Sequence, residues 1–266
     1  MELKLEVKNV SCGYPGKTIV EDISFQVNTG DILCILGPNG VGKTTLFKTI
    51  LGFLKLQGGE ILLDGEDIFK WTRKDFAKAI GYVPQAHTPP FPYKVIDVVV
   101  MGRTAHLGLF SSPSNEDFRI AEEIIDSLGI TYLKNDVYTE ISGGERQLVL
   151  IARALAQEPK MLIMDEPTSN LDFGNQIRVL EHINKLAERN IGIIMTSHFP
   201  NHAFMASTKV LAMGGRDKFV IGDSEEVVTS ELLRDLYHID AQVNTIKDEQ
   251  NNIDTKVCVP IINNKN

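Results

Sequence analysis

Residues 32–44 read Ile-Leu-Cys-Ile-Leu-Gly-Pro-Asn-Gly-Val-Gly-Lys-Thr, an apolar run that passes directly into a glycine-rich segment. Five consecutive apolar residues are typical of a strand that is buried on both faces of a parallel sheet. Apolar residues at helical spacing follow from Leu46 to Leu51, and Gly52 ends them. The pattern therefore predicts a strand, a tight glycine loop and a helix, in that order.

Strands and helices continue to alternate on both sides of this segment. Apolar runs at 161–164 and 191–196 predict two further buried strands, with an amphipathic helix between them. Near the N-terminus, apolar and polar residues alternate at 3–8 and 23–27, as in strands with one buried face. We therefore expect an α/β fold built on a parallel sheet, together with N-terminal antiparallel strands.

Residues 86–158 interrupt this order, and we expect them to form an inserted helical subdomain. They begin with a proline-rich loop at 88–92 and continue with amphipathic helices around 118–128 and 148–155. Ser114 is a candidate N-cap for the first helix and Gly129 a candidate stop. We assign 1–242 to one domain that contains this insertion, and 243–266 to a C-terminal tail. The apolar segment 257–262 leaves two alternatives open for the tail, a terminal strand and a frayed end.

The composition is that of a folded protein. The chain has 266 residues, of which 43% are hydrophobic, and its net charge is −8. The negative charge disfavours a protein that binds nucleic acid by neutralising phosphates. No apolar run approaches the roughly 18 residues needed to cross a bilayer, and the N-terminus lacks the pattern of a signal peptide. We expect a cytosolic chain with no nucleic-acid partner and with buried thiols at Cys12, Cys34 and Cys258.

The glycine-rich segment matches the phosphate-binding pattern GxxxxGK followed by Ser or Thr. Its glycines let successive backbone N–H groups point inward as a cradle for phosphate oxygens, and the helix N-terminus adds the positive end of its dipole. Lys43 has the reach to contact the β- and γ-phosphates, and the Thr44 hydroxyl can ligate Mg²⁺. The segment predicts a nucleotide site formed by Gly37, Pro38, Asn39, Gly40, Val41, Gly42, Lys43, Thr44 and Thr45.

Two carboxylates follow the buried strand at 161–164. Ligands of parallel sheets bind outside the carboxyl ends of the strands, so Asp165 and Glu166 are expected to face the phosphates. Asp165 suits Mg²⁺ or its waters, and Glu166 can polarise the attacking water.

A second candidate anion site begins the helix at 148–155. The chain reads Ile141-Ser-Gly-Gly-Glu-Arg-Gln147, in which Ser142 can cap the helix while Gly143 and Gly144 expose backbone amides. This segment resembles the signature motif of ABC ATPases, where Leu is commoner in place of Ile141. The resemblance extends over residue 3 to about residue 240.

Shorter matches to the same family occur in the expected order. Tyr14 resembles the aromatic residue that stacks on adenine, and Gln85 resembles the Q-loop glutamine. The segment Ser169-Asn-Leu-Asp172 is similar to the D-loop, and His198 is similar to the switch histidine.

The resemblance implies an ATP hydrolase whose cofactors are ATP and Mg²⁺. It implies catalytic roles for Lys43, Gln85, Glu166 and His198, and metal contacts from Thr44, Gln85 and Asp165. It further implies a head-to-tail homodimer, in which Ser142, Gly143 and Gly144 of one subunit close over ATP held by the other. It also places the D-loop residue Asp172 among the residues that bind ATP.

The segment Phe91–Arg103 with the nearby His106 is similar to ATPase subunits of iron-siderophore, haem and cobalamin importers. This resemblance implies a place on the cytoplasmic face of the membrane, with separate permease subunits and, indirectly, an extracytoplasmic binding protein. We expect Phe91, Tyr93 and Arg103 to contribute to the permease-facing surface.

Alternatives to the metal-chelate importer stay open. The sequence after His198 is closer to some molybdate- or tungstate-type members. We expect His202, in that segment, to be a surface histidine rather than a metal ligand. A more distant alternative is a soluble ABC ATPase that acts as an ATP-dependent dimerisation switch.

Overall fold

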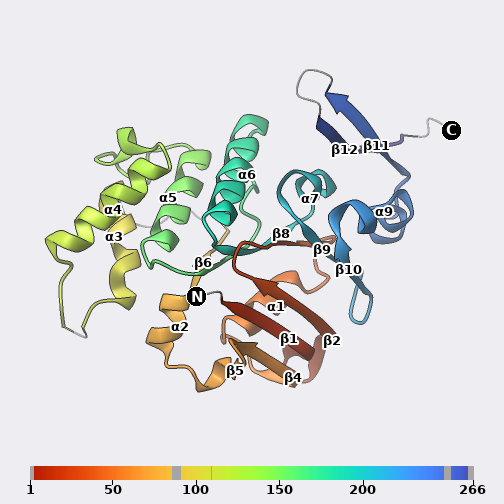
Figure 1. Cartoon of the computed structure of the whole chain (residues 1–266), viewed down its shortest axis with the longest axis horizontal. Coiled ribbons are helices and arrows are strands. Elements are labelled where there is room, and N and C mark those ends of the chain that lie inside the picture. Colours follow the sequence, from red (N-terminus) through yellow and green to blue (C-terminus); the bar gives the residue numbers. More distant parts are fainter. Residues whose placement is uncertain (1–2, 86–90, 109, 249–252, 263–266) are drawn as a thin grey trace.

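The computed structural model describes residues 3–85, 91–108, 110–248 and 253–262. Figure 1 shows the strands in the centre and lower part of the molecule, helices α3, α4 and α5 on one side, and the C-terminal strands at the opposite corner. Residues 88–90 of the expected proline-rich loop lie outside the described part of the chain.

The central sheet has six strands, and it confirms the expected parallel core. β3 lies between β9 and β8, and β7 and β6 follow β8 in parallel order. β10 pairs antiparallel with β9 at the edge. In sheet order the strands are β10 (Phe219–Asp223), β9 (Lys209–Met213), β3 (Ile32–Leu36), β8 (Gly192–Ser197), β7 (Met161–Met164) and β6 (Ile80–Val83).

Strand β3 is buried on both faces, as its apolar run predicts. Cys34 belongs to the apolar cluster on one side of the sheet, whereas Leu33 and Ile35 belong to the cluster on the other. Each such side chain contributes roughly 1.5–3 kcal/mol through burial. Every residue of β3 is buried, so the loop that follows it starts from a rigid support.

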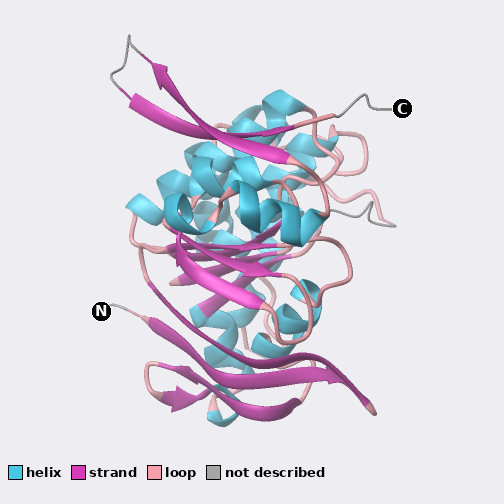
Figure 2. Cartoon of the chain, turned by 90° about the vertical axis from the view of Figure 1, so that its right-hand side faces the viewer, coloured by secondary structure: helices cyan, strands magenta, loops and turns pink. Residues whose placement is uncertain are grey.

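The N-terminal strands form the expected antiparallel sheet, with strand order β2-β1-β4-β5. Figure 2 shows this sheet on one side of the six-stranded sheet and most helices on the other. Helix α1 (Lys43–Ile50) packs with these strands through Leu46, Phe47 and Ile50. The strands are β1 (Lys4–Tyr14), β2 (Lys17–Asn28), β4 (Leu56–Leu63) and β5 (Glu66–Asp67), followed by the 3₁₀ helix η1 (Ile68–Lys70) and helix α2 (Arg73–Ala79).

Described residues between β6 and β7 are mainly helical. Ser114 caps α4 in a capping box with Asp117, and Gly129 follows the helix with φ of 70°. Both features agree with the expected ends of that helix. The division into a subdomain at 86–158 stays a prediction. The helices are α3 (Val95–Val100), η2 (Met101–Ala105), α4 (Asn115–Ser127), η3 (Thr131–Leu133) and α5 (Gly143–Leu155).

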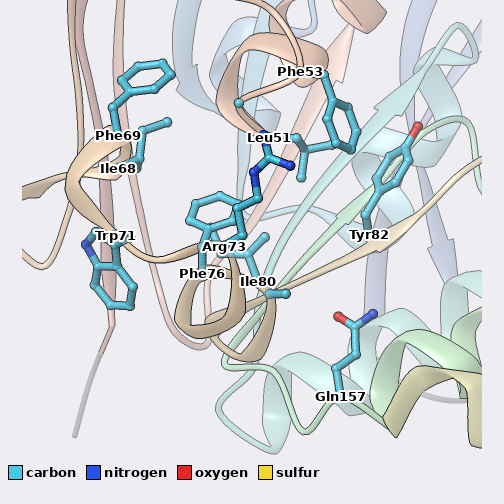
Figure 3. Close-up of a pocket in the computed structure, with 12 residues that line it drawn as sticks. Leu51, Phe53, Ile68, Phe69, Trp71, Arg73, Phe76, Ile80, Tyr82 and Gln157 are labelled. Carbon is cyan, nitrogen blue, oxygen red and sulfur yellow. The ribbon is translucent and has the colours of Figure 1, made fainter. Parts of the chain in front are cut away.

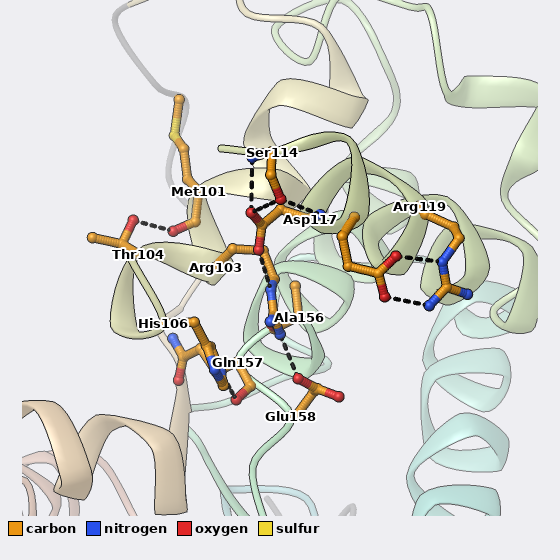
Figure 4. A network of polar contacts seen from close by, with 11 residues as sticks. Met101, Arg103, Thr104, His106, Ser114, Asp117, Arg119, Ala156, Gln157 and Glu158 are labelled. Atoms are coloured by element: carbon orange, nitrogen blue, oxygen red, sulfur yellow. Dashed lines mark hydrogen bonds and ion pairs between the residues drawn. The ribbon is translucent and has the colours of Figure 1, made fainter. Parts of the chain in front are cut away.

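The expectation that Arg103 contributes to the permease-facing surface is wrong, because its side chain is buried. Its Nε donates to Asp117 Oδ1 over 3.0 Å, and its Nη1 donates to Ala156 O over 2.8 Å and to Glu158 Oε2 over 2.6 Å. Figure 4 shows this guanidinium between α4 and the turn that follows α5. Arg103 therefore connects three segments inside the molecule. Phe91 and Tyr93 are exposed.

The C-terminal residues form a hairpin over the part that the structure describes. Strand β11 (Ala241–Asp248) pairs antiparallel with β12 (Ile253–Pro260). The Cys258 N–H donates to Asn201 Oδ1 over 2.7 Å, which attaches β12 to helix α7. The boundary at 242 stays a prediction, although the first hairpin strand begins at Ala241. The remaining helices are α6 (Phe173–Glu188), α7 (Pro200–Ala206), α8 (Ser224–Val227) and α9 (Ser230–Tyr237).

Two of the three cysteines are buried as expected, Cys12 and Cys34, whereas Cys258 is partly exposed. Burial raises the pKa of the Cys34 thiol to about 12. Over the ranges that the structure describes, every helix is too short or too polar to cross a membrane.

Candidate nucleotide site

Four neighbouring strands of the central sheet bring the candidate residues together at their carboxyl ends. β3 leads into the loop that begins at Gly37, and β6 leads to Gln85. Asp165 and Glu166 follow β7, and His198 follows β8. These residues are far apart in the sequence, so the parallel strand order is what assembles the site.

The glycine-rich loop adopts backbone conformations that other residues rarely reach. Gly40 and Gly42 have φ of 87° and 112°. A Cβ on Gly37 would lie 2.4 Å from Met213 O, and one on Gly42 would lie 2.8 Å from Val20 Cγ2. The loop therefore packs closely on β9 and β2, and only glycine fits at these positions.

Lys43 begins α1 and turns its side chain back over the loop. Its Nζ donates to Gly37 O over 2.6 Å and to Pro38 O over 3.0 Å. Burial lowers the pKa of Lys43, and the charges of Glu166 and Asp165 oppose that shift. The ammonium group thus lies between the loop and the two carboxylates.

A cavity of about 280 Å³ opens above the loop. Tyr14 and Glu166 both line it although they are far apart in the sequence, so the structure brings both next to the loop. Gly40 faces open space, and Thr44 is exposed at the start of α1. The other lining residues are Ile19, Asn39, Gly42, Lys43 and Thr45.

Asp165 and Glu166 are held by a residue that sequence reasoning missed. The Thr196 hydroxyl donates to Asp165 Oδ1 over 2.8 Å and accepts from the Glu166 N–H over 2.8 Å. Glu166 itself has φ of 46°, an uncommon value for a residue other than glycine. The signal in the sequence is the pair of hydroxyl residues, Thr196 and Ser197, that ends an otherwise apolar strand.

The Glu166 carboxylate also meets both of the remaining expected side chains. Gln85 Nε2 donates to Glu166 Oε2 over 3.3 Å and to Ser169 Oγ over 3.1 Å. His198 Nδ1 lies 3.5 Å from Glu166 Oε1. A single carboxylate therefore contacts groups from the ends of β6 and β8.

Ser142, Gly143 and Gly144 do not join this cluster within one chain. Ser142 caps α5 in a capping box with Glu145. A Cβ on Gly144 would meet Asn175 at 2.5 Å, so the start of α5 lies against the start of α6. Asp172 caps α6 and accepts from the Asn175 N–H over 2.9 Å. These residues form a second group that does not line the cavity above the loop.

The expectation that His202 is a surface histidine is wrong. Its side chain is 5% exposed, and its Nδ1 lies 3.1 Å from Ser197 Oγ and 3.2 Å from Thr168 Oγ1. Both hydroxyl groups belong to buried residues, Thr168 in the turn after β7 and Ser197 at the end of β8. A polar histidine in a polar segment gives no sign in the sequence that such partners will enclose it.

The donor set fits a nucleotide with a divalent cation. The loop offers backbone groups and an ammonium group to phosphates. The exposed Thr44 hydroxyl, the Gln85 amide and the Asp165 carboxylate supply the oxygen ligands that Mg²⁺ prefers. Fold and site together define a P-loop nucleotide-binding protein.

Comparisons with known proteins give the family. The family model for ABC transporters matches residues 20–169. An uncharacterized ABC transporter ATP-binding protein of Haemophilus influenzae is 44% identical over 88% of this chain and 89% of its own. The chain belongs to the ABC transporter family as an ATP-binding subunit. Such subunits hydrolyse ATP to power transport and act with membrane permease subunits.

Relatives with more specific names match over similar lengths. A Helicobacter pylori protein named as an iron chelatin transport ATP-binding protein is 38% identical over 88% of this chain and 92% of its own. The molybdate import ATP-binding protein MolC of Haemophilus influenzae is 37% identical over 90% of both chains. A solved metal-chelate type ABC transporter in an inward-facing conformation superposes with a TM-score of 0.87, at 34% identity and 98% coverage of both chains.

Proposed function

We propose that this protein is the ATP-hydrolysing subunit of an importer for a metal chelate of the iron-siderophore, haem or cobalamin type. The observation that carries this proposal is the similarity over 98% of the chain to a metal-chelate type ABC transporter. The iron chelatin relative supports the same class of cargo. The subunit would work on the cytoplasmic face of a permease, and an extracytoplasmic binding protein would deliver the chelate.

An apolar cavity supports a permease contact. It has a volume of about 720 Å³ and lies between the end of α1, the segment around α2, and the turn after α5. Figure 3 shows Arg73 among the side chains of Leu51, Phe53, Phe76 and Tyr82. Phe53 and Phe69 line the same cavity and are 68% and 48% exposed, and grouped exposed aromatic side chains are typical of interaction surfaces. We assign this surface, with the exposed Phe91 and Tyr93, to the permease.

We assign the roles of the site residues from their positions. Lys43 and the loop 37–45 would hold the phosphates, and Tyr14 would stack on the base. Thr44, Gln85 and Asp165 would hold Mg²⁺, which would neutralise phosphate charge when bound. Glu166 would polarise the attacking water, and His198 would contact the γ-phosphate.

The separate group at the start of α5 and α6 is assigned to a second copy of the chain. Ser142, Gly143 and Gly144 present the positive end of a helix, which suits phosphate oxygens. They do not line the cavity of their own chain, so a head-to-tail homodimer would supply them, together with Asp172, to the ATP of the partner subunit.

Import of molybdate or tungstate is the second candidate. The relative MolC supports it, because its identity to this chain is nearly the same as that of the iron chelatin relative. The ATP-binding subunit contacts the permease rather than the cargo, so the site residues do not separate these two importers.

The test is affinity purification of the tagged protein from detergent-solubilised native membranes, followed by mass spectrometry. We expect a polytopic permease and its binding protein, and elemental analysis of that binding protein should find iron or cobalt. Molybdenum or tungsten would favour the second candidate. Recovery of the ATPase without any permease would contradict the transport proposal and favour a soluble dimerisation switch.

A further inference from the structure

Helix α7 places one buried histidine between two loops of the nucleotide site. The His202 Nδ1 atom is within hydrogen-bonding distance of two hydroxyl oxygens, Ser197 Oγ and Thr168 Oγ1. Ser197 immediately precedes His198, and Thr168 lies two residues after Glu166. The imidazole therefore joins the turn that carries the proposed water-polarising residue to the turn that carries the proposed γ-phosphate contact.

The bridge to both hydroxyl groups needs the neutral tautomer that carries its proton on Nε2. Burial, together with the neighbouring His198, lowers the pKa of His202 to about 4, so the ring is neutral at physiological pH. With the proton on Nε2, both hydroxyl groups can donate to Nδ1. With the proton on Nδ1, the ring donates to either hydroxyl oxygen. A neutral ring thus ties the two turns together without adding a charge next to Glu166.

Further contacts hold this imidazole in place. The Ser197 hydroxyl oxygen accepts from the Phe199 N–H over 3.0 Å. The Phe199 ring lies between the two histidines, with its centroid 4.1 Å from that of His198 and 5.1 Å from that of His202. Asn201, the preceding residue of α7, is bonded to the Cys258 N–H of β12. Movement of His202 would therefore displace the loop that presents His198.

We propose that His202 is a positioning residue for ATP hydrolysis, which holds Glu166 and His198 at their working separation. His202 is not among the residues that line the nucleotide cavity. The inference rests on the proposed roles of Glu166 and His198. We expect substitution of His202 to slow the chemical step. Nucleotide binding should change little, because the phosphate-binding loop follows β3, whereas His202 contacts residues beside β7 and β8.

The test compares two substitutions in the purified full-length protein, with ATP and Mg²⁺. His202→Leu removes the ring nitrogens and keeps an apolar volume, whereas His202→Asn keeps a short polar group that can donate or accept. We expect His202→Leu to lower kcat roughly 10- to 100-fold, the size of effect that a small misplacement produces. KM and the affinity for ATP should stay near those of the wild type. His202→Asn should recover most of kcat.

The matched control is His182→Leu on α6, a partly exposed histidine outside the site, and it should leave kcat unchanged. Thr168→Val removes the other end of the bridge while keeping the shape of the side chain. Thr168→Val should also lower kcat. If His202→Leu does not fold, Thr168→Val serves as the test of the bridge.

Wild-type kcat in His202→Leu or, failing its folding, in Thr168→Val would overturn the inference. So would equal losses in His202→Leu and His202→Asn, or a loss of ATP affinity as large as the loss of kcat. Failure of the underlying assignment is seen separately, because Glu166→Gln would then hydrolyse ATP at the wild-type rate whatever the histidine variants do.

Discussion

At the scale of single residues, Glu166 is held from three directions. Its N–H is bonded to Thr196, its Oε2 to Gln85, and its Oε1 lies near His198. The left-handed backbone at this residue costs free energy, and the neighbouring contacts must maintain it. Such preorganisation suits a carboxylate that has to orient one water molecule.

Replacement of Glu166 by glutamine should separate binding from hydrolysis. The amide keeps the shape of the side chain but is a poor proton acceptor, so we expect hydrolysis to slow on the order of 100-fold or more while ATP still binds. Phosphate release and size-exclusion chromatography with ATP would measure the rate and the trapped dimer. The control is Glu188→Gln at the exposed end of α6. A wild-type rate in Glu166→Gln would show that another group polarises the water.

Replacement of Lys43 by alanine should act on binding instead. The ammonium group now bonded to Gly37 O and Pro38 O is the cation nearest to the phosphate cradle. Loss of a charged hydrogen bond costs about 1.5–3 kcal/mol, so ATP affinity should fall roughly 10- to 100-fold. Equilibrium binding of a fluorescent ATP analogue measures this change. Lys48→Ala on the same helix is the control, and equal losses in both variants would contradict the assignment.

At the scale of elements, Arg103 joins η2 to α4 and to the turn between α5 and β7. His106 adds a contact to the same turn, because its Nε2 lies 2.8 Å from Gln157 O. Helix α5 begins at the signature segment, and Asp165 directly follows β7. These contacts therefore hold helix α5 and the strand that precedes the two carboxylates as one unit.

Arg103→Ala should destabilise the fold strongly. It leaves the buried Asp117 carboxylate without its cation, and removal of one member of a buried pair costs about 3–5 kcal/mol. Urea unfolding followed by circular dichroism would measure the loss. Arg119→Ala on α4 breaks only exposed ion pairs with Glu116 and Glu123, so it should leave the free energy of unfolding nearly unchanged. Equal costs in the two variants would show that burial of the Arg103 cluster adds nothing.

The same cluster should weaken in acid. Hydrogen bonds from Ser114, together with those from Arg103, lower the pKa of Asp117 to about 2, below the value near 4 of the unfolded chain. The unfolded state takes up the proton first, so the stabilisation is complete above about pH 4 and is lost as the pH falls toward 2. Unfolding free energies of wild type and Asp117→Asn should differ by a constant amount above pH 4. Their difference should shrink below it, and a constant difference down to pH 2.5 would contradict the assignment.

At the scale of the whole molecule, the hairpin of β11 and β12 reaches the nucleotide site through α7. Asn201 Oδ1 accepts from the Cys258 N–H, and its Nδ2 makes a longer contact of 3.4 Å to Cys258 O. The Lys256 ammonium donates to Glu225 O over 2.6 Å and holds the same strand to α8. Strand β12 thus helps to support the segment that carries His198.

Asn201→Ala should loosen this attachment without unfolding the chain. Loss of one side-chain acceptor for a partly buried N–H costs about 1–3 kcal/mol locally, so the Cys258 amide should exchange its proton roughly 10-fold faster or more. Hydrogen exchange monitored by mass spectrometry measures this at β12. Asn244→Ala on the exposed side of β11 is the control. Unchanged exchange at β12 in Asn201→Ala would show that pairing with β11 alone holds the strand.

Sequence patterns predicted the parts of the molecule that depend on neighbouring residues. Local residue spacing is enough to predict the apolar strand β3, the glycine loop and the cap at Ser142. Arg103 and His202 were expected on the surface and are buried. Their partners lie far along the chain, at Glu158 and Thr168, and burial of a polar group depends on such partners. Thr196 was missed for the same reason, because its partners Asp165 and Glu166 also lie far from it in the sequence.

The attachment of β12 to α7 has a consequence for how the protein is made. Cys258 lies 57 residues after Asn201, so this contact forms only after the intervening segment has left the ribosome. Domains otherwise begin to fold during synthesis from their N-terminal side. The phosphate-binding loop can therefore fold before the contact between Cys258 and Asn201 has formed. We expect a nascent subunit in that interval to bind nucleotide before the contact that supports the His198 segment has formed.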